Sequence, residues 1–290
     1  FFFCFVCLEI LPQSHIKEVS INAKASGLFD ATVNVDGGAN YLTTRIYSPT
    51  GELVDSCETT RKSHSQGLYT PINLVNAPKL WSPEFPNLYT AEFTIYEGNM
   101  PLHTVSKKFG FRTVEVKQRD GIYVNGVKAV RMSHYPPDDH FLDVCDSLGL
   151  FVMDELTGWH GHYDTKVGSK LVKEMIEHDM NHPSVIFWAN GNEGGHNLEL
   201  DKYFTEFDIQ QRPVVHPWQL FGGFDTQHYR EYNYGIGNYE NGKEIVMPTE
   251  FLHGWFDGGH GAGIEDYWEK MWHNPLSAGG FLWDFADNAV

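Results

Sequence analysis

The sequence is poor in cysteine, in positive charge and in long apolar runs, and each shortage excludes a class of protein. Its 290 residues include four cysteines, too few and too scattered for a disulfide framework. Lys and Arg total 21 against 38 Asp and Glu, a formal net charge of −17. Such a surface repels phosphate backbones, so no nucleic-acid partner is expected. No stretch approaches the roughly 18 apolar residues of a membrane span, so no membrane partner is expected either.

The N-terminal segment, residues 1–15, begins with an apolar run and is assigned to no domain. It contains Cys4 and Cys7 in a lone CxxC. A zinc site needs a second ligand pair at suitable spacing, and none is evident. The run resembles the apolar middle of a signal peptide, but it lacks an initiator Met and a basic flank. We therefore interpret it as a truncated or mis-joined start.

Residues 16–118 alternate apolar and polar side chains with a period of two, which is typical of half-buried strands. The chain as a whole is 41% hydrophobic and 20% charged, the composition of a folded globular protein. The predicted strand segments are 16–24, 30–37, 40–56, 90–98 and 104–117, with turn residues such as 48–51 between or within them. About seven short strands in about a hundred residues predict an immunoglobulin-like β-sandwich.

Residues 119–290 show a different rhythm, in which short apolar strands alternate with amphipathic helices. The predicted strands are 129–132, 150–154, 185–190, 213–216, 245–250 and 279–285, with a weaker one at 224–229. The predicted helices are 138–149, with Asp138 as its cap and Gly149 at its end, 169–180, capped by Ser169, and 264–272. This alternation is typical of a parallel sheet, and seven such strands favour a (β/α)8 TIM barrel over an open sheet.

The barrel is expected to lack its first strand–helix unit. Residues 121–126 run almost directly into the strand at 129–132, although a crossover between parallel strands needs a dozen or more residues. The range 119–290 is also shorter than the ~200 residues that such barrels usually need. We place the missing unit at the Val127–Lys128 junction; the alternative is a fold that is not a closed barrel.

Polar and ionisable side chains follow the predicted strands at their carboxyl ends, where TIM barrels carry their active sites. In chain order they are Arg131, Ser133, His134 and Tyr135, then Asp154 and Glu155, Asn192 and Glu193, Glu250, and Trp283 with Asp284. Helix capping and solvation explain one or two of these residues but not all of them. Two carboxylates on different strands suit glycoside hydrolysis, in which one protonates the leaving oxygen and the other attacks the anomeric carbon. Glu193 and Glu250 fit this pattern, although a single Glu is ordinarily a solvated surface residue.

Several segments resemble glycoside hydrolase family 2 and, within it, the β-galactosidase branch. They are NHPSVIFWANGNEGG (181–195), AVRMSHYP (129–136), FLDVCDSLGLFVMDE (141–155), GGFLWDFAD (279–287), APKLWSPEFPNLYTAEF (77–93) and KKFGFRTVEV (107–116). They occur in the family's order from about residue 16 to residue 290. The resemblance implies a retaining exo-glycosidase that hydrolyses terminal β-D-galactosyl residues from oligosaccharides by double displacement. The family's N-terminal sugar-binding jelly roll has no counterpart in the sequence.

The resemblance also implies a role for each matching residue. Glu193 matches the general acid/base, which would begin protonated, and Glu250 matches the nucleophile. Asn192 would hydrogen-bond the sugar 2-hydroxyl, and Tyr229 would hydrogen-bond the nucleophile. The substrate-binding residues implied in this way are Asn192, Arg131, His134, Tyr229, His253, Trp283 and His160.

No metal or other cofactor is expected. Family β-galactosidases often bind Mg²⁺ through a Glu and a His after the third strand, together with the acid/base Glu. His160 matches that His, but Gly158 or Trp159 stands where the acidic ligand is expected, and hard cations prefer carboxylate oxygens. A transition-metal pair of His160 and His162 is the alternative, and it would make the protein a metal-dependent hydrolase.

Other functions stay open beside a β-galactosidase whose partner is a β-galactoside oligosaccharide. One is a β-glucuronidase or β-mannosidase of the same family; a glucuronidase should place cationic residues near the sugar carboxylate, and no such cluster is evident. Another is a catalytically inactive carbohydrate-binding relative, which would not need two poised carboxylates. The sequence leaves a homo-oligomer open and assigns no compartment.

Overall fold

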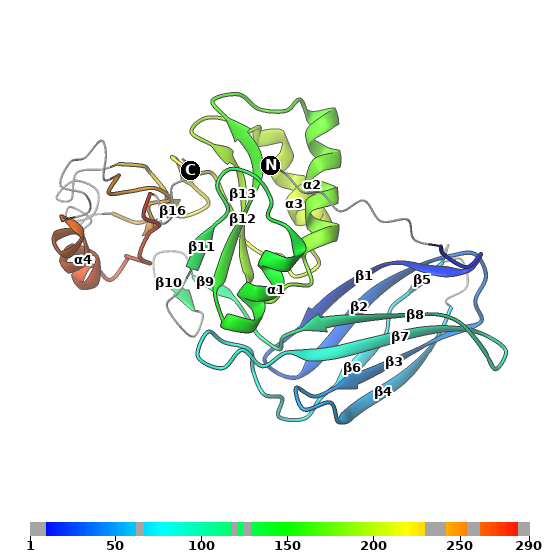
Figure 1. Ribbon diagram of the computed structural model, residues 1–290. Helices are drawn as coiled ribbons and strands as arrows, with labels where there is room; N and C mark the ends of the chain where they lie inside the picture. The colour runs from blue at the N-terminus through cyan, green and yellow to red at the C-terminus, as the bar shows by residue number, and fades with distance from the viewer. Residues whose placement is uncertain are drawn as a thin grey trace. The chain divides into compact units, whose positions relative to one another are not determined.

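The computed structural model describes residues 10–61, 67–117, 121–123, 129–229, 242–253 and 262–283 (Figure 1). The chain forms two compact units, one of Phe1–Lys79 and Leu88–Phe111 and the other of Leu80–Asn87 and Arg112–Val290. The segment Leu80–Asn87 thus belongs with the second unit, although it lies inside the range predicted for the sandwich. Cys4 and Cys7 lie outside the described residues. Within those residues, no helix is long and apolar enough to cross a membrane.

The first unit contains two antiparallel sheets. One has the strand order β1-β2-β5, with β6 also pairing with β2, and the other has the order β4-β3-β7-β8. The first sheet consists of β1 (His15–Ala23), β2 (Leu28–Asp36), β5 (Leu68–Tyr69) and β6 (Ile72–Leu74). The second consists of β3 (Tyr41–Tyr47), β4 (Leu53–Thr60), β7 (Tyr89–Glu97) and β8 (Met100–Phe109).

The two sheets share one core, because alternate residues of their strands face inward. On β2 every second side chain is buried from Phe29 to Val35. The ring of Phe29 lies 6.5 Å from that of Phe93 on β7 and 4.9 Å from that of Phe109 on β8. The predicted run 40–56 forms the two strands β3 and β4, joined at a turn in which Gly51 N–H donates to Ser48 O. The unit is the predicted β-sandwich.

The second unit is built on parallel strands that follow one another in chain order, as in a TIM barrel. The sheet order is β11-β12-β13-β14, and every pair in it is parallel. These strands are β11 (Ala129–Arg131), β12 (Phe151–Trp159), β13 (Val185–Asn192) and β14 (Val214–Val215). Their buried runs are those predicted from apolar stretches, but β12 continues to Trp159. Asp154 and Glu155 therefore lie inside a strand and not at its end.

Further along the chain the parallel pairing continues in shorter pieces. β15 (Leu220–Phe221) pairs antiparallel with β16 (Phe224–Asp225), which pairs parallel with β17 (Ile245–Val246). In the described part of the predicted strand 279–285, a single parallel bridge joins Leu282 to Phe251. Before β11, a hairpin of β9 (Glu115–Lys117) and β10 (Gly121–Tyr123) is antiparallel.

Helix α1 (Asp139–Leu148) has both of the predicted ends. The Asp138 side chain accepts a hydrogen bond from Phe141 N–H, and Gly149 closes the helix at φ +71°. A Cβ at Gly149 would lie 2.4 Å from Pro83 O, so this position requires glycine for its conformation and for the close approach. The end signals of this helix are local, which is why the sequence predicted them.

Helix α2 (Thr165–Asp179) begins earlier than predicted. Its cap is Asp164, whose carboxylate accepts from Val167 N–H, so the prediction of a Ser169 cap is wrong. The Ser169 hydroxyl instead donates to Lys166 O inside the helix. The sequence predicted neither η1 (Leu198–Leu200) nor α3 (Asp201–Phe207), whereas α4 (Ile264–His273) matches the predicted 264–272.

Helices α1, α2 and α3 lie along one side of β12 and β13 in Figure 1. Their apolar faces form one core with those strands, in which Leu142, Val172 and Phe204 are fully buried. All eight residues of β13 are buried, which is typical of a strand covered on both faces. Cys57 and Cys145 are free thiols. Burial, and then the charge of Asp146, raises the pKa of Cys145 to about 12.

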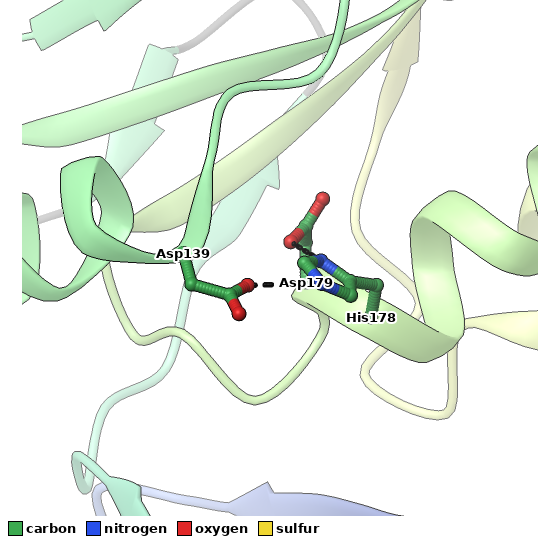
Figure 2. Close-up of side chains that lie close together, drawn as sticks. All are labelled: Asp139, His178 and Asp179. Carbon is green, nitrogen blue, oxygen red and sulfur yellow. Dashed lines mark hydrogen bonds and ion pairs between the residues drawn. The ribbon is translucent and has the colours of Figure 1, made fainter. Parts of the chain in front are cut away.

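A chain of acidic groups joins the start of α1 to the end of α2 and continues into β12. Figure 2 shows the outer part, in which His178 Nε2 lies 2.9 Å from Asp139 Oδ1 and Nδ1 lies 2.6 Å from Asp179 Oδ1. Asp179 and Asp154 are both fully buried. Burial, and then the charge and hydrogen bond of Asp179, raises the pKa of Asp154 well above its ordinary value. The raised pKa favours the protonated form of Asp154, whose O–H can then donate to Asp179.

We predict that Asp154→Asn makes the protein more stable at pH 8 and flattens the dependence of stability on pH. The raised pKa of Asp154 means that its contribution is fully present below the ordinary value of 3.8 and is lost as the pH rises through the folded value. The amide keeps a donor for Asp179 and needs no proton. Thermal unfolding at pH 5 and pH 8 measures this difference, because a change of 1 kcal/mol in the free energy of unfolding shifts Tm by about 2–4 °C. If the stability of the wild type and of the variant changed equally between pH 5 and pH 8, that result would contradict the raised pKa of Asp154 as the source of the pH dependence.

Candidate active site

Arg131, at the end of β11, joins the ends of several strands through one buried guanidinium. Its side chain is 3% exposed. Nη1 donates to Glu250 Oε1 at 2.8 Å and to Thr249 O at 3.1 Å. Nη2 donates to Asn192 Oδ1 at 2.7 Å. Nε and Nη2 lie 2.9 and 2.7 Å from Glu155 Oε2. The guanidinium therefore makes four hydrogen bonds and a further ion-pair contact through Nη2.

Glu155 is the carboxylate behind Arg131, and the sequence did not assign it a role. It is fully buried, and its Oε1 lies 3.0 Å from His134 Nδ1. The side chain thus orients both Arg131 and His134. Its only sequence signal was an acidic residue after an apolar run, and that signal pointed to a strand end, whereas Glu155 lies within β12.

Both carboxylate oxygens of Glu250 accept hydrogen bonds from neighbouring side chains. Oε1 accepts from Arg131, and Oε2 accepts from the Tyr229 hydroxyl at 2.5 Å. Burial, and then the hydrogen bond to Glu250, raises the pKa of Tyr229 above its ordinary range, so the phenol keeps its proton and remains a donor. Charge-assisted hydrogen bonds of this kind suit a carboxylate. Glu250 therefore presents to the site a carboxyl group that is fixed through both of its oxygens.

Glu193 follows β13 and meets a different set of donors. Oε2 accepts from Trp159 Nε1–H at 2.9 Å and lies 3.4 Å from His160 Nε2, while Oε1 lies 3.1 Å from His228 Nδ1. Burial raises the pKa of Glu193, but the hydrogen bonds of Trp159 and His228 and the histidine charges outweigh burial, so the net direction is downward. A bound ligand that excludes water from Glu193 strengthens the burial contribution and favours the protonated form.

The backbone at this end of the strands is strained, and glycines permit it. Glu193, His160 and Tyr229 have φ values of +44°, +56° and +48°, a left-handed conformation that costs free energy for residues with a Cβ. A Cβ at Gly195 would lie 2.4 Å from Gly158 C. Glycine at Gly195 therefore lets the end of β12 approach the loop after β13. This approach places Trp159 and His160 against Glu193.

Glu193 and Glu250 face each other across His228. One ligating atom of each of the three side chains lies within 4.8 Å of the others. Carboxyl groups about 5–5.5 Å apart are typical of retaining glycosidases, whereas inverting enzymes need ≈ 6.5–9.5 Å for a water. Two carboxylates this close can therefore act on the two atoms of a single bond, one by attacking the carbon and the other by protonating the leaving oxygen.

Aromatic rings complete the site around His134. The His134 ring is stacked on Trp283, 5.3 Å between centroids at 17°, and lies 5.3 Å from Trp159. The His253 ring lies 6.0 Å from that of Tyr229. The structure thus brings together the nine site residues that the sequence predicted: Glu193, Glu250, Asn192, Arg131, His134, Tyr229, His253, Trp283 and His160. It adds Glu155, His228 and Thr249, of which His228 had no sequence signal beyond its position next to Tyr229.

Metal binding is tested by the donor atoms. The described clusters with ligating atoms close enough for one ion are Asp139, His178 and Asp179; Asp143, Asp146 and His182; and Glu193, His228 and Glu250. Beside His160, Glu193 Oε2 has the indole N–H of Trp159 as its other neighbour, and the clusters of ligating side chains found among the described residues do not include His160, whereas Mg²⁺ prefers several oxygen ligands. The described residues around His160 do not fit Mg²⁺.

The chain belongs to glycosyl hydrolase family 2. Residues 14–112 match the family described as "Glycosyl hydrolases family 2", and residues 112–290 match "Glycosyl hydrolases family 2, TIM barrel domain". These matches confirm the family that the sequence motifs predicted.

Curated relatives carry two different activities in their names. A putative beta-glucuronidase of Formosa agariphila is 28% identical over 72% of this chain and 30% of its own length. A beta-galactosidase of Leuconostoc mesenteroides is 26% identical over 74% of this chain and 27% of its own. A beta-galactosidase of Halalkalibacterium halodurans is 24% identical over 98% and 35%. The chain spans about a third of the length of these relatives.

Solved structures with the same fold cover nearly the whole chain. The beta-glucuronidase of Bifidobacterium dentium, solved with coumarin-3-O-glucuronide, superposes with a TM-score of 0.79 at 19% identity, over 95% of this chain and 61% of the other. A glycosyl hydrolase family 2 member of Bacteroides cellulosilyticus gives 0.76 at 19% identity, over 94% and 46%. At this identity the likeness shows the fold, a sandwich domain followed by a TIM barrel.

We predict that Glu155→Ala lowers the free energy of unfolding by about 3 kcal/mol, because it removes a partner of the buried Arg131 charge. Glu155→Gln, which keeps an acceptor, should cost less. Chemical denaturation measures both. The matched control is Lys173→Ala, which removes an exposed pair with Glu177 worth only about 0.3–0.5 kcal/mol. A Glu155→Ala protein no less stable than this control would refute the role of the buried network.

Proposed function

We propose that this chain carries the catalytic site of a retaining exo-glycosidase that removes terminal β-D-galactosyl residues from oligosaccharides by double displacement. The observation that supports it most strongly is that one carboxylate oxygen of Glu193 and one of Glu250 lie within 4.8 Å of each other, an approach that suits retention better than the ≈ 6.5–9.5 Å separation of inverting enzymes. In this proposal Glu250 attacks the anomeric carbon while Glu193 protonates the leaving oxygen. Glu193 then accepts a proton from the water that releases the sugar.

The unpaired amide of Asn192 supports a sugar hydroxyl as the ligand. Because Arg131 donates to Asn192 Oδ1, the amide Nδ2 is turned the other way. Nδ2 is buried and has no hydrogen-bond partner among the described residues, and an unmade hydrogen bond on a buried donor is costly. We assign this donor to the sugar 2-hydroxyl. Trp283, on which the His134 ring is stacked, forms the aromatic floor, and His134, His253 and His160 are assigned to other hydroxyls.

The hydrogen bonds that Arg131 already makes to protein groups support a neutral sugar over a uronic acid as the substrate. A glucuronide needs a cationic donor for its carboxylate. Among the described residues, Arg131 is the one Arg or Lys that contacts Glu193 or Glu250, and its hydrogen bonds already go to Glu155, Thr249, Glu250 and Asn192. A β-galactoside needs no such donor. The β-glucuronidase, the β-mannosidase and the inactive carbohydrate-binding relative are the alternatives that an assay separates.

We also propose that the barrel lacks its first strand–helix unit. In the described part of the chain, β11 pairs with β12 alone. Only residues 124–128 separate β10 from β11, too few for the crossover that a parallel neighbour requires.

A panel of aryl β-galactoside, β-glucuronide and β-mannoside tests the substrate. We expect the galactoside to be cleaved with the highest kcat/KM, with and without EDTA. Preference for the glucuronide or mannoside would replace the proposed sugar. If none of the three is cleaved, the proposal of an enzyme is wrong and a carbohydrate-binding protein is favoured. Loss of activity in EDTA would favour a metal-dependent hydrolase.

Azide rescue assigns the two carboxylates. Glu250→Ala and Glu193→Ala should each lose at least about 10³-fold in kcat, measured with 2,4-dinitrophenyl β-galactoside for the first and with a phenyl galactoside for the second. Azide should restore turnover of Glu250→Ala as the α-galactosyl azide, because a single attack from that face inverts the centre. With Glu193→Ala it should give the β-azide, because attack follows formation of the glycosyl-enzyme. The opposite pairing of products would reverse the two roles, and full activity of either variant would end its assignment.

A further inference from the structure

We propose that His228 is a positioning residue that keeps Glu193 in its proton-donating form, through a ring tautomer set by Thr249. The inference rests on the proposed glycosidase function and concerns how its acid is prepared. His228 follows β16, and its imidazole lies between the two carboxylates. Nδ1 is 3.1 Å from Glu193 Oε1 and 3.5 Å from Glu250 Oε2. Nε2 faces away from them, 2.8 Å from Thr249 Oγ1.

Thr249 decides where the imidazole proton resides. Its Oγ1 lies 3.0 Å from Thr226 O, and a carbonyl oxygen can only accept. A hydroxyl has one hydrogen to donate. When that hydrogen goes to Thr226, Thr249 Oγ1 meets His228 as an acceptor. The Thr249 hydroxyl then donates to Thr226 O and accepts from His228 Nε2, which requires the proton of His228 to be on Nε2.

The ring carries only that one proton. Burial lowers the pKa of His228 to about 4, against the opposing effect of the Glu250 charge and with a smaller contribution from Arg131 in the same direction as burial. Nδ1 of this neutral tautomer is a bare acceptor. An acceptor facing an ionised Glu193 makes no hydrogen bond, whereas a protonated Glu193 donates to it. The hydrogen bond by which His228 lowers the pKa of Glu193 requires a proton on Nδ1. The Nε2 tautomer removes that contribution, so it favours the acid form of Glu193 and leaves Trp159 to favour the ionised form.

The other tautomer has the opposite effect. With its proton on Nδ1, His228 would donate to Glu193 and to Glu250 and would stabilise both charges. The groups that face this pair are Arg131 and Tyr229 around Glu250 and His160 beside Glu193. None of them contacts Nε2, so Thr249 is the group that distinguishes the two tautomers.

The reaction balances with His228 neutral throughout. The proton leaves Glu193 for the glycosidic oxygen as the bond from that oxygen to the anomeric carbon breaks and Glu250 forms its ester. In the second step water attacks the anomeric carbon, Glu193 takes the water proton, and Glu250 leaves as the carboxylate. His228 supplies no proton to the sugar; it sets the fraction of Glu193 that begins each cycle protonated.

Thr249→Val tests the proposal, because valine keeps the shape and removes the hydroxyl. The basic limb of the kcat/KM profile, which reports the acid in the free enzyme, should move down by about one pH unit. At pH 7.5 an alkyl or phenyl β-galactoside should lose about tenfold in kcat/KM. The 2,4-dinitrophenyl galactoside, whose leaving group needs no proton, should stay within twofold. Thr249→Ser, which retains the hydroxyl, should restore the wild-type basic limb.

The matched control is Thr94→Val, which removes a buried hydroxyl, paired with Thr104 at 3.0 Å, in the first unit. It should leave the pH profile and the leaving-group dependence unchanged. Equal losses for both leaving groups in Thr249→Val would mean a purely structural role and overturn the proposal, as would an unmoved basic limb. A wild-type protein that cleaves no aryl β-glycoside would instead reject the proposed function. Activity in the wild type with no effect in Thr249→Val would reject this inference alone.

Discussion

The buried guanidinium of Arg131 is the interaction on which the rest of the site depends. One positive charge lies between two carboxylates, Glu155 behind it and Glu250 in front, and its remaining donors reach Asn192 and Thr249 O. A charge removed from water is stable only when its hydrogen bonds are complete. The strand ends must therefore converge on Arg131 in one arrangement, and that arrangement places Glu250 and the Asn192 amide where a sugar can meet them.

The two catalytic candidates differ because their neighbours differ. Glu250 accepts from a permanent cation and from a phenol whose raised pKa keeps it a donor. Glu193 meets Trp159 and two histidines, on a loop that a glycine lets approach β12. A double displacement needs one carboxylate that stays charged and one that exchanges a proton, and such environments separate the two roles. Burial by substrate and the proposed tautomer of His228 both favour the protonated form of Glu193.

What the sequence predicted depended on how local each signal was. The ends of α1 follow from Asp138 and Gly149 themselves, and the buried strand β13 follows from its apolar run. The start of α2 was misplaced because Asp164 and Ser169 are both good caps, and packing chooses between them. Glu155 was misjudged because β12 continues beyond its apolar residues to Trp159. The position of His228 against Glu193 and Thr249 unites three distant segments, and no local pattern carries that information.

The central claim is that Glu250, positioned by Arg131 and Tyr229, is the nucleophile that attacks the anomeric carbon. The direct measurement is peptide mass spectrometry after incubation with 2,4-dinitrophenyl 2-deoxy-2-fluoro-β-galactoside. Fluorine slows both steps, while the activated leaving group speeds the first, so the glycosyl-enzyme accumulates. The account predicts one fluorogalactosyl group per chain, on the peptide that contains Glu250 and on that residue. A label on Glu193 or Glu155, or turnover of galactosides with no covalent adduct, would contradict it.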